Sequence, residues 1–82
     1  MQGRTMQDSE IKEKIAAHIA KIKFCGIQKN LVICDDVVLY VYSNLKRANI
    51  YHHRKDADKI IELIVGTLQY CGVNHIAHIT GL

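Results

Sequence analysis

Cysteines and histidines are the side chains of this chain that could hold a metal or support a reaction, and Cys71, His75 and His78 have the most ligand-like spacing. Their spacing is neither the paired CxxC nor the helical HExxH arrangement that characterises zinc sites. On a β-strand, His75 and His78 would point to opposite faces, so only a turn or a helix would bring them together. We therefore expect no metal and no cofactor, and these three residues are the candidates if a metal binds.

The three cysteines occupy related positions in the sequence. Cys25 and Cys71 each stand just before a glycine that is expected to end a helix, and Cys34 ends an expected strand. Free cysteine most often behaves as a small buried hydrophobic residue, so we expect all three to be buried. The negative end of a helix also disfavours a reactive thiolate at Cys25 or Cys71.

Other catalytic patterns are missing from the sequence. The five glycines stand apart and form no phosphate-binding loop, and the two serines, Ser9 and Ser43, lie in no triad context. The pair Asp35-Asp36 fits a hairpin turn better than a general acid and base. We expect that the protein is not an enzyme.

Length and composition favour one small globular domain. The 82 residues are 49% hydrophobic and 23% charged and include no proline, which suits a single core with short connections. We expect a domain over residues 8–82 after a disordered or loosely held tail over residues 1–7. The start of the chain lacks the apolar region of a secretory signal, no apolar run is long enough to span a membrane, and the odd cysteine count favours a reducing compartment. The cytoplasm is the expected location.

An internal repeat organises the chain. Residues 19–33 resemble residues 65–79 at a constant offset of 46, so that FCGI at residues 24–27 recurs as YCGV at residues 70–73. Each copy is typical of a helix that ends on a glycine and passes straight into a buried strand.

The first predicted helix covers residues 9–25, because its isoleucines recur at helical spacing. Asp8 or Ser9 would cap its start, and Gly26 would end it in the left-handed conformation. His18 lies near the centre of the apolar stripe, where a partly buried, hydrogen-bonded histidine is expected. The stripe is formed by Ile11, Ile15, Ile19 and Ile22.

A second helix and a last strand follow the same pattern. Residues 56–58 would open this helix, which would run to Tyr70 or Cys71, before Gly72. A strand over residues 76–80 would follow Val73. The apolar stripe of the helix consists of Ile60, Ile61, Ile64, Leu68 and Cys71.

Between the helices, the sequence LVICDDVVLYVY predicts a hairpin with strands at residues 31–34 and 37–43. Residues 46–54 fit a strand over 48–53, a loop or an early start of the next helix, and we favour a loop or a short edge strand. The chain is thus predicted to be a small α+β domain of order α-β-β-α-β. Its two helices would pack on one face of a three- or four-stranded sheet, like a split βαβ (ferredoxin-like) unit that lacks its first strand.

The exposed face of that sheet carries our functional prediction. Alternation along the second strand places Val38, Tyr40 and Tyr42 on the face away from the helices, near Tyr51. Contiguous apolar and aromatic surface marks interfaces, and tyrosine is enriched at hot spots. We expect a non-catalytic protein-interaction or self-association module that forms a homo-oligomer or inhibits or regulates a larger complex, with a protein or itself as partner and no membrane contact.

A nucleic-acid-binding domain is the alternative. Lys46, Arg47, Arg54 and Lys55 lie in a basic segment over residues 46–59 that could hold phosphates while the tyrosines stack on bases. The segment has few cations and contains no recognised RNA-binding motif, so we place this reading second.

Overall fold

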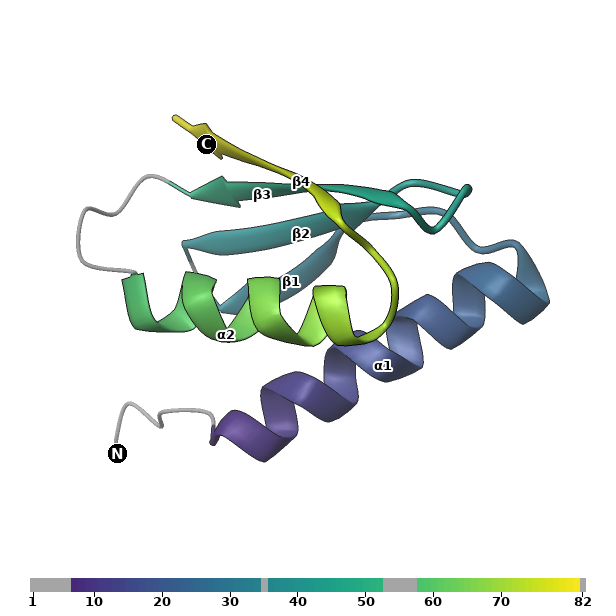
Figure 1. The fold of residues 1–82 in the computed structure, drawn as a ribbon, viewed down its shortest axis with the longest axis horizontal. Coiled ribbons are helices and arrows are strands. Elements are labelled where there is room, and N and C mark those ends of the chain that lie inside the picture. The colour runs from purple at the N-terminus through teal and green to yellow at the C-terminus, as the bar shows by residue number, and fades with distance from the viewer. Residues whose placement is uncertain (1–6, 35, 53–57, 82) are drawn as a thin grey trace.

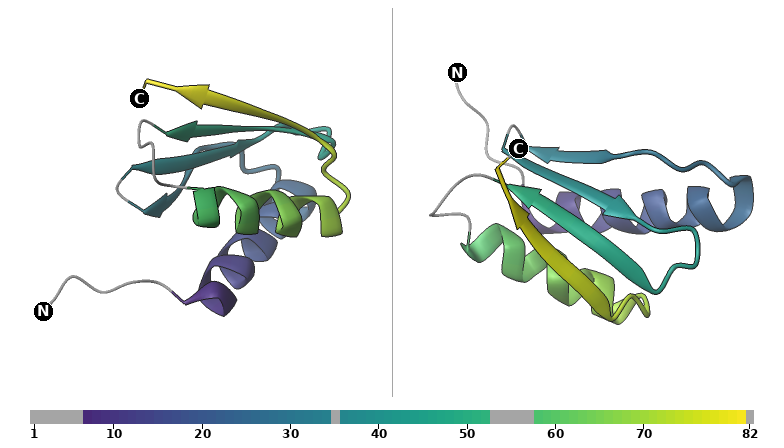
Figure 2. Two further views of the ribbon diagram at one scale, coloured as in Figure 1. Left: turned by 60° about the vertical axis from the view of Figure 1, so that its left-hand side comes forward. Right: turned by 90° about the horizontal axis from the view of Figure 1, so that it is seen from above.

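The computed structural model describes residues 7–34, 36–52 and 58–81 as two helices and four strands (Figure 1). The four strands form one mixed sheet in the order β1-β2-β3-β4, and both helices lie against the same face of that sheet (Figure 2). The predicted α+β class is therefore confirmed. In chain order the elements are α1 (Asp8–Cys25), β1 (Leu31–Cys34), β2 (Val37–Val41), β3 (Arg47–His52), α2 (Asp58–Tyr70) and β4 (His75–Thr80).

Helix α1 begins slightly earlier than predicted. Gln7 precedes its first turn in an extended conformation, and the backbone N–H of Gln7 donates to Oε1 of Glu10 at 3.0 Å. The expected cap at Asp8 or Ser9 is therefore wrong, because a glutamate side chain satisfies a free N–H at the helix start instead. Gln7 thus belongs to the start of the helix, and residues 1–6 of the predicted tail lie outside the described residues.

Both helices end on the predicted glycines. Gly26 has a φ of 69° and Gly72 a φ of 94°, which are left-handed values that an L side chain rarely adopts. The N–H of Gly26 donates to the carbonyl of Ile22 at 3.2 Å, and the N–H of Val73 donates to that of Leu68 at 2.8 Å. These bonds satisfy carbonyls that the last helical turn leaves free.

Beyond the glycines, the two repeat copies differ. Val73 is fully buried, whereas the equivalent Ile27 is 39% exposed and is followed by irregular chain as far as Asn30. The strand β4 is mostly exposed. The prediction that each copy passes straight into a buried strand is therefore wrong for both strands.

The predicted hairpin is formed by β1 and β2, with Leu31 paired to Leu39 and a register shift between Val32 and Cys34. Along β2, the side chains of Val37 and Leu39 are buried against the helices, and the intervening residues face the other way, as predicted. Asp35 of the expected turn lies outside the described residues.

Residues 47–52 form the third strand, and β3 is an interior strand rather than the loop or edge strand that we favoured. It pairs antiparallel with β2 and parallel with β4. A tight turn makes this possible, because the N–H of Leu45 donates to the carbonyl of Tyr42 at 2.8 Å and the N–H of Tyr42 donates to that of Arg47 at 2.9 Å. Leu45 takes a φ of 59° in this turn.

The core lies between the two helices and the inner face of the sheet. Helix α2 crosses from the end of β3 to the start of β4, so these two strands are direct parallel neighbours. Neither described helix is long and apolar enough to cross a membrane. The buried hydrophobic residues are Ile11, Ile15, Ile22, Ile33, Val37, Leu39, Val41, Ala48, Ile50, Ile61, Ile64, Leu68 and Val73.

Candidate interaction surface

The face of the sheet opposite the helices, called the open face below, has no helix over it in the described part of the chain (Figure 2). Alternation along each strand sends every second side chain to this face, and the pairing register aligns those side chains in rows across the sheet. The open face is formed by Val32, Val38, Tyr40, Tyr42, Arg47, Asn49, Tyr51, His75, Ala77 and Ile79.

One of these rows is entirely apolar and aromatic. Val38 of β2 pairs with Tyr51 of β3, and Tyr51 pairs with Ile79 of β4. Val32 of β1 extends this row, since it pairs with Val38. At the two ends of the row, 53% of Val32 and 38% of Ile79 remains exposed. A continuous strip of this kind crosses all four strands.

One amide holds two of the three tyrosines of the open face in place. Nδ2 of Asn49 lies 3.1 Å from the hydroxyl of Tyr42 and 3.1 Å from that of Tyr51, and donates to both. The rings of Tyr40 and Tyr42 meet edge to face, with 5.2 Å between their centroids. Rings fixed in this way lose little conformational freedom on binding, which favours a preformed contact surface.

The charge on the open face is positive and small. The guanidinium of Arg47 lies over the Tyr42 ring, 5.9 Å from its centroid, in a cation–π arrangement. None of the residues in the four described strands is an aspartate or a glutamate. The surface is therefore mainly apolar and aromatic, with a basic group at one end.

The four predicted partner-binding residues, Val38, Tyr40, Tyr42 and Tyr51, all lie on this face. Sequence reasoning missed Asn49, which lies between two of the tyrosine hydroxyls. The signal for it was present, because Ala48 and Ile50 alternate with polar residues as a half-buried strand requires.

The basic residues of the alternative are only partly described. Arg47 lies on the open face beside Tyr42, and Lys46 is exposed in the turn before β3, where its backbone N–H donates to Oδ1 of Asn44 at 2.8 Å. Arg54 and Lys55 lie outside the described residues. Of the two basic residues that the structure describes, Arg47 is the one that lies on the tyrosines.

The candidate metal residues do not converge. His75 pairs with Arg47 on the open face, whereas His78 pairs with Ile50 and points toward the helix side of the sheet. Cys71 is exposed in the turn after α2. Within residues 7–34, 36–52 and 58–81, no three histidine, cysteine, aspartate or glutamate side chains form a group that could hold a metal ion.

The burial predicted for the cysteines is also wrong in part. Cys34 is half-buried against the core, but Cys25 and Cys71 are exposed, and all three are free thiols. The physical reason is that each helix extends past the core in its last turn. Ile22 in α1 and Leu68 in α2 are the last buried positions of their helices.

His18 is more deeply buried than predicted. Its side chain is only 5% exposed among the isoleucines of α1, and its Nε2 has no hydrogen-bond partner among the described residues. Burial, together with the positive charge of Lys21, lowers the pKa of His18, while a hydrogen bond with the backbone of Lys29 acts in the opposite direction. His18 is therefore a neutral core residue, and it is remote from the open face because it lies on the helix side of the sheet.

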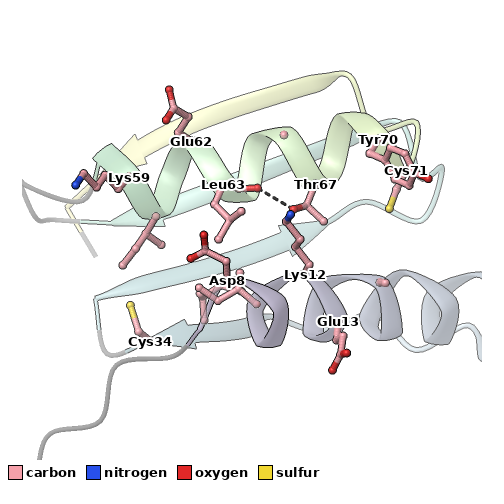
Figure 3. A pocket seen from close by; sticks show the side chains of 15 residues that line it. Asp8, Lys12, Glu13, Cys34, Lys59, Glu62, Leu63, Thr67, Tyr70 and Cys71 are labelled. Carbon is pink, nitrogen blue, oxygen red and sulfur yellow. Dashed lines mark hydrogen bonds between the residues drawn. The ribbon is translucent and has the colours of Figure 1, made fainter.

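A groove separates the outer surfaces of α1 and α2 (Figure 3). Its lining includes Ile33 and Cys34 of β1. Lys12 points from α1 toward α2 (Figure 3). The hydroxyl of Thr67 already donates to the carbonyl of Leu63 at 2.8 Å. The groove has a volume of about 1350 Å³, which is larger than the ~300–1,000 Å³ typical of small-molecule sites. Its lining includes the charged side chains of Asp8, Lys12 and Glu62 and the free thiols of Cys34 and Cys71.

Comparison of the chain with protein-family models, with curated proteins and with solved structures found no match. The function is therefore inferred from the open face and from the residues around it.

Proposed function

We propose that this protein is a small non-catalytic interaction module that binds a protein partner through its open face. The observation that carries this proposal is the row of apolar and aromatic side chains across all four strands, from Val32 through Val38 and Tyr51 to Ile79, which neither described helix covers (Figure 2). Exposed surface of this composition marks protein interfaces, and tyrosines at its centre are typical hot spots.

The tyrosine network supports the same conclusion. Asn49 donates to the hydroxyls of Tyr42 and Tyr51, so these two hydroxyls are hydrogen-bonded within the face while the ring surfaces stay available. A rigid aromatic surface with few charges suits a protein surface better than a small charged ligand. A role as inhibitor or regulator of a larger complex fits this size and this surface, and the odd number of cysteines keeps a reducing compartment such as the cytoplasm as the expected location.

Affinity capture with three forms of the protein tests this proposal. The wild-type chain, the double variant Tyr40→Ala/Tyr42→Ala and the control Tyr70→Ala are immobilised at equal density, and the captured proteins are quantified by mass spectrometry. Tyr70 is 93% exposed but lies on α2, far from the open face. The control therefore removes the same kind of side chain as the double variant, but from a different surface. We expect partners that both the wild type and Tyr70→Ala retain and that the double variant loses. Equal capture by all three folded forms would exclude the open face as the binding surface.

Nucleic acid is the second candidate, and two observations favour it. The stacking of Arg47 on Tyr42 and the lack of carboxylates in the described strands would let a single strand place bases on the tyrosines and a phosphate near the guanidinium. Titration with fluorescent single-stranded and duplex oligonucleotides at several salt concentrations tests it. Binding that weakens steeply with salt and is lost in Arg47→Gln would support this candidate. No binding at low salt would eliminate it.

A further inference from the structure

The outer edge of β4 offers a row of unpaired backbone groups. The N–H of His75 donates to the carbonyl of Lys46 at 3.1 Å, and the N–H of Gly81 donates to that of His52 at 3.1 Å. Odd-numbered residues of β4 therefore bond to β3. The backbone N–H and C=O groups of Ile76, His78 and Thr80 consequently point away from the sheet. Among the described residues, no strand pairs with this edge.

This edge lacks the features that usually prevent strand pairing. Natural edge strands are short, bulged, or carry lysine, glutamate or proline. The opposite edge, β1, has four residues and a register shift between Val32 and Cys34. By contrast, β4 has six residues with the sequence HIAHIT, no proline and no acidic, lysine or arginine side chain. Five of its six residues are exposed. Of the two edges, β4 is the one that is open to another strand.

We propose that two copies of this chain pair through β4, antiparallel and about a two-fold axis perpendicular to the sheet. Such an axis keeps the open faces of both copies on the same side, so residues of equal parity must face each other across the seam. In the register centred on Ala77, the two Ala77 residues are opposite each other, Ile79 faces the second copy's His75, and Ile76 faces the second copy's His78.

The sequence of β4 complements itself in this register. Each isoleucine meets an imidazole ring, and the smallest side chain lies on the axis. The neighbouring register, centred on His78, would place two histidines opposite each other and would extend the pairing to Gly81, where the φ of 89° takes the chain out of the strand. The register centred on Ala77 is therefore the favoured one.

The helix layer provides room and further contact for the second copy. A groove lies between α2 and β4, and Ile61, Val65 and His78 contribute to its lining. Since the second copy's Ile76 would lie beside His78 on the helix side of the sheet, it would enter this groove against Ile61 and Val65. Asp58 and Glu62 also line the groove, so each copy presents two carboxylates near the histidines of the seam.

The dimer would extend the proposed binding surface. Two open faces joined along β4 make a continuous sheet of eight strands, with the Val32-to-Ile79 row repeated on each side of the axis. This inference goes beyond the proposed function and does not depend on it, because pairing uses the edge of the sheet and partner binding uses its face.

A proline substitution tests the pairing of the backbone. His78→Pro removes an N–H that points outward and leaves the bonds to β3 intact, whereas the control His78→Ala keeps that N–H and removes the ring. By sedimentation velocity over a concentration series, we expect a dimer for the wild type and for His78→Ala. We expect the dissociation constant of His78→Pro to rise roughly tenfold or more, since each copy loses a hydrogen bond across the seam. Circular dichroism confirms that each variant is folded.

A cross-link tests the register without weakening the strand. In a background of Cys25→Ser and Cys71→Ser, Ala77→Cys places two thiols at a non-hydrogen-bonded pair, where Cα atoms lie ~4.5 Å apart and a disulfide fits. Ala17→Cys on the exposed side of α1 is the matched control. With oxidised glutathione, we expect a covalent dimer for Ala77→Cys and little for Ala17→Cys.

Specific outcomes would overturn the inference. A wild-type chain that stays monomeric at 100 µM and does not cross-link at Ala77→Cys contradicts it. A dimer that persists in His78→Pro but is lost in Tyr40→Ala/Tyr42→Ala would place self-association on the open face. That result would contradict the pairing through β4 and would not contradict the proposed function. Loss of captured partners in the double variant with an intact dimer is the result expected when both proposals hold.

Discussion

At the scale of single residues, His18 is the polar side chain that the described core buries. An unpartnered Nε2 in the interior costs about 1–3 kcal/mol, and a charge there would cost more. Burial thus keeps His18 neutral in the folded state, with its pKa below the ordinary value of 6.5. The unfolded chain accepts a proton at this residue more readily than the folded chain does.

This difference predicts a loss of stability in acid. Full stability is present above the unfolded pKa of 6.5, and it declines as the pH falls from there toward the lowered pKa of the folded state. We expect His18→Leu to raise the unfolding free energy by about 1 kcal/mol at pH 7 and to give a larger gain at pH 5. Urea unfolding at both pH values measures this. The control Ala17→Leu places the same side chain at an exposed position of α1 and should retain the wild-type pH dependence, and an equal effect of both variants would contradict the prediction.

Asn49 is the residue that fixes two of the tyrosines of the open face. Removal of its amide in Asn49→Ala leaves the hydroxyls of Tyr42 and Tyr51 without their donor, in a half-buried setting. We expect a loss of ~1–2 kcal/mol in unfolding free energy, from two modest hydrogen bonds. Asn74→Ala is the control, because its amide makes a long 3.4 Å contact to Gly72 in an exposed turn. Its expected loss is below ~0.5 kcal/mol. Similar losses in both variants would show that the tyrosine network contributes nothing.

At the scale of elements, an added methyl group should change the unfolding free energy differently at Gly66 and at Gly72, although both glycines have free space around them. A Cβ at Gly26, Gly66 or Gly72 would meet no atom within 4 Å, so only the backbone decides. Gly72 has a φ of 94°, whereas Gly66 lies inside α2. We expect Gly72→Ala to lose about 1 kcal/mol and Gly66→Ala to gain ~0.5–1 kcal/mol in unfolding free energy, measured at low micromolar concentration. Destabilisation by Gly66→Ala would indicate a contact on α2 that the single chain does not have.

Some of the helices and strands could be predicted from the sequence alone. The isoleucine stripe of α1 and the alternation of β2 are strong periodic signals of burial on one side, and both led to the correct elements. The strand β3 was one of three alternatives and its interior position was not predicted, because Arg47 and Asn49, two of its open-face residues, are polar and resemble a loop. The interior position of β3 depends on its pairing with β4, which follows α2 in the chain, and local sequence does not encode that pairing.

The candidate site was predictable to a similar extent. Val38, Tyr40 and Tyr42 could be placed by alternation within one strand. Ile79 could not be placed, because an apolar residue in a short strand has the same local pattern at an edge as in the interior. The exposure of Cys25 and Cys71 follows from where each helix passes the end of the core, which is a property of the whole packing.

At the scale of the whole molecule, the two faces of the sheet differ in their environment. One face meets both helices and holds the buried side chains, while the other presents Val32, Ile79 and the tyrosines to solvent. Isolated exposed hydrophobic residues are common on soluble proteins, and Phe24, which is 77% exposed at the end of α1, is one of them. The proposal requires that several neighbouring side chains of the open face contact the partner together. A single exposed residue such as Phe24 cannot provide such a surface.

A matched pair of charge substitutions tests this requirement. Val32→Lys puts a charge on the open face at β1, the edge remote from β4, and Phe24→Lys puts the same charge on an isolated apolar residue. Because both side chains are more than half exposed, each change in unfolding free energy should stay within about 0.5 kcal/mol. We expect Val32→Lys to abolish capture of the partners while the dimer persists in sedimentation, and Phe24→Lys to alter neither. If capture declined equally in both variants, binding would depend on general surface hydrophobicity and the open face would lose its special role.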